Sequence, residues 1–158
     1  MRKLSVLRAF AAMAIAACVF SSCKEDQTSL SADSLPGRAK IMGRLVYDDG
    51  RAADRIAVNT VVYVKVDNNS IDNNASGVTV RTTTTDAEGY FEYELPTNET
   101  GVDVTVEGAQ FEGVYYSSYT DSDECIYSGA TANRSNVSSN DIVSFGTIMY
   151  SSHTLLDY

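Results

Sequence analysis

Short, β-branched runs separated by turns recur along this 158-residue chain and limit the folds that it can adopt. In the clearest run, 60–67 (TVVYVKVD), the residues Val62, Val64 and Val66 alternate with their neighbours and form one uniformly apolar face. A period of two is typical of a strand with one buried face, whereas a helix repeats every ~3.6 residues. The run 102–106 alternates in the same way. We therefore expect strands whose apolar faces meet in a shared core.

Other runs extend this pattern along the chain. Strands are expected at 41–47, at 78–85, at 90–95 with Pro96 as the stop, and at 142–150. No window after residue 39 has helical periodicity, and β-branched residues and tyrosine dominate the runs. Several short strands with turn signals between them predict an all-β sandwich.

A family resemblance supports this fold. The strings 85–91 (TDAEGYF) and 95–96 (LP) resemble the T-D-x-x-G-x-F…L-P core of carboxypeptidase regulatory-like, or transthyretin-like, domains. The segment 43–50 (GRLVYDDG) is similar to the opening strand and turn of that family, and 104–108 and 145–148 resemble two later strands. The resemblance implies a single Greek-key, immunoglobulin-like sandwich over residues 40–158, usually a stability or docking module.

The motif has a physical basis in its turn. Asp86 can cap the turn with its carboxylate, and Gly89 can take the positive φ that the turn requires. Phe91 then begins a strand with its ring toward the core.

The stretch 109–141 departs from the family pattern, and we expect it to be an irregular, tyrosine-rich insertion before the last strand. Long irregular connections in compact domains are usually functional or disordered. If the segment is extended, Phe111, Tyr115 and Tyr119 share one face and could form an aromatic platform for sugar rings. The alternative, which we favour, is that these rings pack against the sandwich.

The N-terminus indicates export. A basic start precedes the apolar run 9–20, whose 12 residues are too few to span a bilayer, and small residues follow. The pair of serines before Cys23 resembles the lipobox of bacterial lipoproteins, which implies a signal peptide at 1–22 and a lipid on Cys23. Cys18 fits the lipobox as well, but cleavage there leaves an apolar start to the mature chain. A cleaved signal without lipid is the third alternative.

Lys24, Glu25 and Asp26 follow the lipid site and resemble the export tag of Bacteroidota-type lipoproteins. That resemblance implies transport to the outer face of the outer membrane. Residues 23–39 are small and polar, as expected of a flexible tether. Within the tether, Ser34 stands in a D-S-L motif that resembles an O-glycosylation acceptor of such exported proteins.

Charge and cysteine content exclude several classes of protein. The chain has a formal charge of −9 with 12 basic residues, and removal of the signal peptide takes away three of these 12 and lowers the charge to −12. We therefore expect no nucleic-acid partner. In the mature domain only Cys125 remains besides Cys23, so no intramolecular disulfide can form. We expect Cys125 to be buried, with nearby carboxylates raising its thiol pKa.

Catalytic and metal motifs are weak. His153 is the only histidine and lies near the end of the chain, where a Ser-His-Asp arrangement would be hard to hold. Acidic stretches at 48–49, 67–74 and 121–124 offer oxygen ligands for calcium, but turn roles explain them better. We therefore expect no enzyme activity, no metal and no cofactor.

These observations predict a lipid-anchored outer-membrane protein exposed at the cell surface. Its domain would be a non-catalytic binding or accessory module for a glycan or an outer-membrane protein complex. The alternative is a structural or adhesin-like subunit that assembles through an exposed strand edge.

Overall fold

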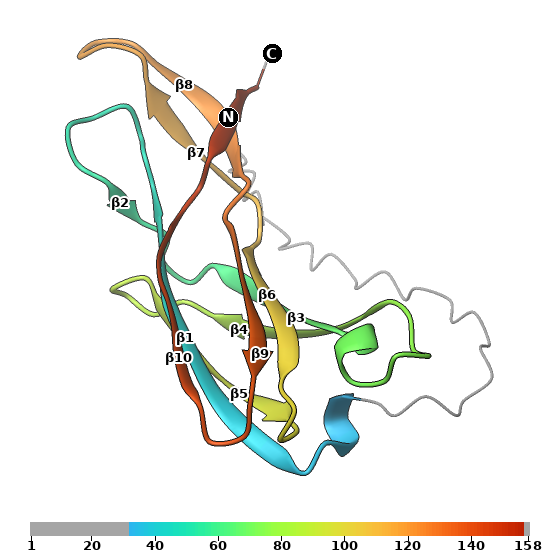
Figure 1. The fold of residues 1–158 in the computed structure, drawn as a ribbon. Helices are drawn as coiled ribbons and strands as arrows, with labels where there is room; N and C mark the ends of the chain where they lie inside the picture. Colours follow the sequence, from blue (N-terminus) through green and yellow to red (C-terminus); the bar gives the residue numbers. More distant parts are fainter. Residues whose placement is uncertain (1–31, 157–158) are drawn as a thin grey trace, which may run out of the picture.

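The computed structural model describes residues 32–156, which fold into strands arranged as a β-sandwich with a smaller sheet at one end (Figure 1). The expected signal peptide, Cys23 and the tag of Lys24, Glu25 and Asp26 lie outside these residues. Within the described part the only helices are two short 3-10 turns, η1 (Ala32–Ser34) and η2 (Asn68–Ser70). No helix between residues 32 and 156 is long and apolar enough to cross a membrane.

The first sheet is built around β1, which has strands on both of its edges. β10 pairs in parallel with β1 along one edge, whereas β5 and then β2 pair antiparallel along the other. The first and last long strands therefore lie side by side and close the domain. The members of this sheet are β1 (Gly37–Tyr47), β2 (Arg55–Ile56), β5 (Tyr90–Thr97) and β10 (Ile142–Met149).

The second sheet is antiparallel throughout and has the order β4-β3-β6-β9. β4 and β9 are its edge strands, and each pairs on one side only. The chain changes sheets between β4 and β5 and again between β9 and β10. Its strands are β3 (Val61–Asp67), β4 (Val78–Thr84), β6 (Val102–Gly108) and β9 (Thr131–Val137).

The core lies between these two sheets, as the alternation predicts. Val62, Val64 and Val66 are at most 1% exposed, and the valines of β6 that were expected to face inward are equally buried. The prediction of which face of each strand is buried is therefore confirmed. β1 and β5 supply the opposite wall. The large apolar side chains that the first sheet contributes to the core are Ile41, Leu45, Phe91, Leu95, Phe145 and Ile148.

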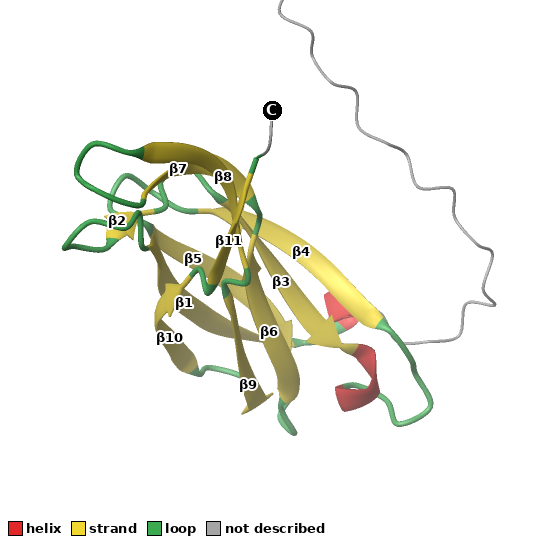
Figure 2. Cartoon of the chain, turned by 90° about the horizontal axis from the view of Figure 1, so that it is seen from above, coloured by secondary structure: helices red, strands yellow, loops and turns green. Residues whose placement is uncertain are grey.

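The third sheet has the order β11-β8-β7 and stands at the end of the sandwich. Its β7–β8 hairpin rises beside the loop that joins β1 to β2 (Figure 1). Seen from above, the two 3-10 turns lie at the opposite end of the molecule from that hairpin (Figure 2). The strands are β7 (Phe111–Tyr116), β8 (Ser122–Ser128) and β11 (Ser152–Leu155).

The turn motif at 85–91 forms as expected. Asp86 Oδ1 accepts hydrogen bonds from the amides of Glu88, at 3.0 Å, and Tyr90, at 2.8 Å. Gly89 has a φ of +80°, and Phe91 is 2% exposed. Pro96, however, does not end the strand: β5 is an edge strand, where a missing N–H removes no partner, so pairing continues to Thr97.

Packing and strand pairing begin several residues before the boundary expected between tether and domain. β1 begins at Gly37, not after residue 39, and both Ala32 and Leu35 are buried. Leu35 belongs to the hydrophobic core, so this part of the polar stretch 23–39 is held by packing that its composition conceals.

The expected irregular insertion at 109–141 is also wrong in form. It supplies all of β7, β8 and β9, and β9 completes the second sheet by pairing with β6. β9 is exposed along most of its length, so its sequence (TANRSNV) carries no apolar alternation. Backbone pairing, which any sequence can make, holds it in place.

Candidate functional site

The aromatic side chains of the third sheet divide into two groups. The first is an aromatic cluster that faces the end of the sandwich. Phe111 lies at its centre, with ring centroids 5.0–5.1 Å from three tyrosines. Such stacked and edge-on contacts stabilise a fold beyond the area they bury. The members of the aromatic cluster are Tyr47, Phe111, Tyr115, Tyr127, Tyr150 and His153.

Two buried hydroxyls anchor this cluster to the backbone. Tyr127 donates to the carbonyl oxygen of Val114 at 3.1 Å, and Tyr150 donates to that of Ala109 at 2.6 Å. Both phenols are protonated at physiological pH, and burial raises the pKa of each further. The aromatic cluster therefore holds the third sheet on the sandwich.

Cys125 lies beneath the cluster with no exposed surface, as expected. Burial raises the pKa of its thiol, so the cause is desolvation and not the neighbouring carboxylates that the sequence suggested. A buried, protonated thiol is a poor nucleophile.

The second group of aromatic side chains lines a tyrosine cleft between the β7–β8 turn and the β1–β2 loop. Its volume, ~700 Å³, falls within the usual range of small-molecule sites. Tyr119 stands fully exposed at the tip of the hairpin, whereas Tyr116 is half-buried in the wall. The residues that line the tyrosine cleft are Gly50, Arg51, Ala52, Tyr116, Ser118 and Tyr119.

Gly50 makes this cleft possible because it lets the two walls meet. Its φ is +82°, and a Cβ at this position would lie 2.1 Å from the carbonyl oxygen of Tyr116. The amide of Tyr116 in turn donates to the carbonyl oxygen of Asp49 at 2.8 Å. The β1–β2 loop is thus joined to β7 at a backbone approach that only glycine permits.

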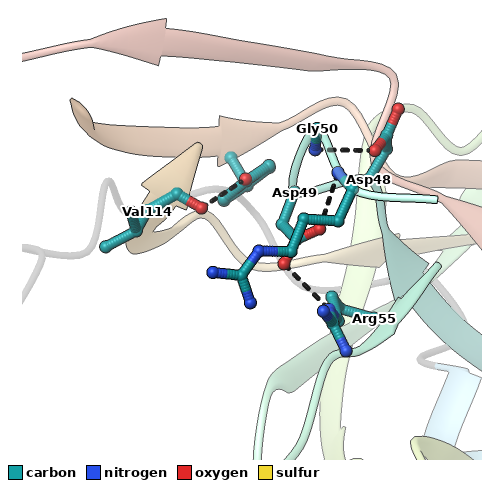
Figure 3. A network of polar contacts seen from close by, with 7 residues as sticks. Asp48, Asp49, Gly50, Arg55 and Val114 are labelled. Atoms are coloured by element: carbon teal, nitrogen blue, oxygen red, sulfur yellow. Dashed lines mark hydrogen bonds and ion pairs between the residues drawn. The ribbon is translucent and has the colours of Figure 1, made fainter. Parts of the chain in front are cut away.

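Asp49 accepts hydrogen bonds within the β1–β2 loop and holds the shape of that loop (Figure 3). Its carboxylate is 6% exposed and accepts hydrogen bonds from the Arg51 amide at 3.1 Å and from Nε of Arg55 at 2.8 Å. Burial opposes ionisation, but the hydrogen bonds from Arg55 and Arg51 outweigh it and lower the pKa of Asp49. Asp48 adds a further bond by accepting the Gly50 amide at 2.8 Å.

This loop fixes Arg51 over the cleft. The guanidinium carbon of Arg51 lies 3.6 Å from the centroid of the Tyr116 ring, a close cation–π contact. Cation–π stacking engages the face of the guanidinium and leaves its N–H donors at the edge available. The cleft therefore combines an exposed aromatic ring with a positioned cation.

The structure separates the three residues expected to form one platform. Phe111 and Tyr115 share a face of β7, as expected, but that face points into the aromatic cluster. Tyr119 lies in the turn and lines the cleft. Ser34 is exposed at the end of η1, and His153 stacks on Tyr115.

Sequence reasoning missed Arg51 and Tyr116 as partners. The only signal was the turn string 48–50 (DDG), which marks a tight loop but not the strand it contacts.

Several acidic residues considered as calcium ligands act in turns. Asp67 and Asp72 accept the amides of Asn69 and Asn74 at 3.0 and 2.9 Å, and Asp121 accepts the Ser118 hydroxyl at 3.2 Å. Between residues 32 and 156, no three His, Cys, Asp or Glu side chains gather as metal ligands would.

No protein-family model matches the chain, and no curated protein matches it. Among solved structures it is similar to a 9R-lipoxygenase from Cyanothece PCC8801, with 14% identity and a TM-score of 0.44 over 81% of this chain. It spans only 18% of the lipoxygenase. It is also similar to a Pseudomonas aeruginosa protein described as a candidate carbohydrate-binding protein, with 16% identity and a TM-score of 0.43. That match covers 72% of this chain and 88% of the other.

Proposed function

We propose that this protein is a lipid-anchored surface lipoprotein of the outer membrane and that its β-sandwich is a non-catalytic, glycan-binding module. The lipobox-like sequence ending in Cys23 and the tag of Lys24, Glu25 and Asp26 support the location. The tyrosine cleft supports the binding role, and the exposed ring of Tyr119 at its rim is the observation that carries it.

The chemistry of the cleft suits a sugar. Carbohydrate rings present apolar C–H faces that pack on aromatic rings, and hydroxyl groups that need hydrogen-bond partners. Tyr119 offers an open face, and Arg51 offers hydrogen-bond donors in the same lining, whereas the Ser118 hydroxyl is already bonded to Asp121. Nothing in this set resembles a nucleophile paired with a base, so the proposed activity is binding without catalysis.

The test is affinity electrophoresis of the purified chain through gels that contain different polysaccharides. Tyr119→Ala should remove the retardation by a polysaccharide that slows the parent chain, without a change in the unfolding transition. Tyr90→Ala is the matched control, because Tyr90 is an exposed tyrosine that lies outside the cleft. Equal retardation of Tyr119→Ala and the parent chain would refute the proposed site.

A second function, assembly through a strand edge, is supported by β4. This edge strand carries Val78 and Val80 with 53% and 44% of their surfaces exposed. Unpaired edges can template pairing with another chain. Sedimentation over a range of concentrations tests this alternative. A chain that stays monomeric contradicts it, whereas dimers of the parent chain that are lost in Val80→Lys support it.

A further inference from the structure

Resting on the proposed function, we infer that the tyrosine cleft selects acidic glycans and that Arg51 binds a uronic-acid carboxylate. The charge of the lining is the first observation that supports this ligand. Of the residues that line the cleft only Arg51 is charged, so the lining presents a single positive group, although the carboxylates of Asp49 and Asp121 accept hydrogen bonds from Arg51 and Ser118 of that lining. A cation placed in an otherwise neutral lining favours an anionic group there.

The hydrogen-bond state of Arg51 separates it from the other arginines. Within residues 32–156 its guanidinium donates no hydrogen bond and joins no ion pair, although its ring contact is the shortest cation–π distance of the described part. All its donors are therefore uncommitted toward the part of the chain that the structure describes. The remaining arginines of that part each donate through the guanidinium, to Leu35 from Arg38, to Glu88 from Arg44, to Asp49 from Arg55, to Asp33 from Arg81 and to Asn133 from Arg134.

Position and orientation of this side chain are set in advance. The Arg51 amide donates to buried Asp49, and the guanidinium carbon lies 3.6 Å from the centroid of the Tyr116 ring. A preorganised planar fork loses little freedom on binding and matches a carboxylate with two parallel hydrogen bonds. A neutral sugar hydroxyl uses one such donor and no charge, so it gains less from this arrangement.

A carboxylate alone would fit an acidic peptide as well as a sugar. Tyr119 favours the sugar, because its ring is fully exposed in the same cleft lining as Arg51 and offers a flat face on which a sugar ring can pack. The expected ligand is thus a sugar ring on Tyr119 whose carboxylate faces Arg51.

The test compares polymers that differ only in charge. Polygalacturonate, alginate and hyaluronan are each used beside their methyl-esterified forms, and binding of the purified chain is measured by affinity electrophoresis and calorimetry. We expect at least one acidic polymer to bind about tenfold or more tightly than its ester, because a hydrogen-bonded charge pair is lost on esterification. Arg51→Gln should remove that preference.

Arg44→Gln is the matched control, since Arg44 also lies over a tyrosine ring, that of Tyr90, but away from the cleft. It should leave the preference intact, and thermal melts should show that both variants are folded. Equal affinity for acid and ester, or a preference that survives Arg51→Gln, overturns the inference while leaving a Tyr119-dependent glycan site standing.

Two other results are informative. Binding to poly-glutamate as tight as to any glycan, with the same loss in Arg51→Gln, overturns the sugar in favour of an acidic peptide. Binding of the parent chain to neutral polymers alone refutes the acidic ligand, and binding to no glycan of either kind refutes the proposed function together with the inference.

Discussion

The ring of Tyr115 on β7 stacks on the imidazole of His153 on β11, with centroids 3.9 Å apart and planes inclined by 19°. β8 lies between these two strands, so the contact spans the full width of the third sheet. The only histidine of the chain, which the sequence offered as a remote catalytic candidate, thus holds the last strand in place.

This stack should contribute measurable stability. We expect Tyr115→Ala and His153→Ala each to lower the free energy of unfolding, and the double variant to lose less than their sum by ~0.5–1.5 kcal/mol, the usual coupling of an aromatic pair. Urea denaturation of the four proteins measures the difference. Strictly additive losses would mean that the two rings do not stabilise each other.

Gly50 and Gly77 form a natural pair for separating backbone strain from steric contact. Their φ values are +82° and +84°, but only at Gly50 would a Cβ meet another atom, the carbonyl oxygen of Tyr116. Gly77→Ala should therefore cost only the left-handed backbone term, ~1–2 kcal/mol. Gly50→Ala should cost more, because the loop must also move off β7.

Denaturation curves and glycan retardation of the two variants check this prediction. The parent ligand affinity should persist in Gly77→Ala and fall in Gly50→Ala, since only the latter displaces a wall of the tyrosine cleft. Equal stability losses with unchanged binding in both would contradict the proposed role of the close approach.

Asp49 gives the fold a dependence on pH with a definite sign. Its carboxyl pKa is lowered in the folded state, so its contribution is complete above the pKa of the unfolded chain, ~3.9, and is lost as the pH falls through the folded value. At pH 7, Asp49→Asn should be less stable than the parent by ~1–3 kcal/mol, the worth of hydrogen bonds to a charged group.

The measurement is the stability difference between parent and Asp49→Asn from pH 7 down to pH 2. We expect the gap to narrow below about pH 4. Asp54→Asn, an exposed carboxylate on the same loop, provides the control with a small, nearly constant effect. A gap that stays constant to pH 2 would show that charge on Asp49 does not stabilise the loop.

Cys125 reports on the opening of the third sheet. Because its thiol is buried and its pKa is raised by that burial, a thiol reagent should label it only when the sheet opens or the chain unfolds. His153→Ala weakens one attachment of β11 and should speed the labelling. Rapid labelling of the native parent protein would contradict the burial of this side chain.

Much of the sandwich could be predicted from local pattern. The valines at 62, 64 and 66 are buried because a strand with a period of two must turn one face inward, whatever its partners are. The turn at Asp86 and Gly89 followed from the chemistry of those side chains alone. β9 could not be predicted, because an exposed edge strand held by backbone pairing leaves no apolar signature.

The candidate site shows the same division. The gathering of tyrosines in 109–141 and the tight turn after β1 are readable from the amino-acid sequence, because composition and turn chemistry are local properties. The inward position of Phe111 and Tyr115, the outward position of Tyr119 and the contact of Arg51 with Tyr116 emerge only in the folded chain. These relations depend on how the third sheet packs on the sandwich, and packing joins residues that are distant along the chain.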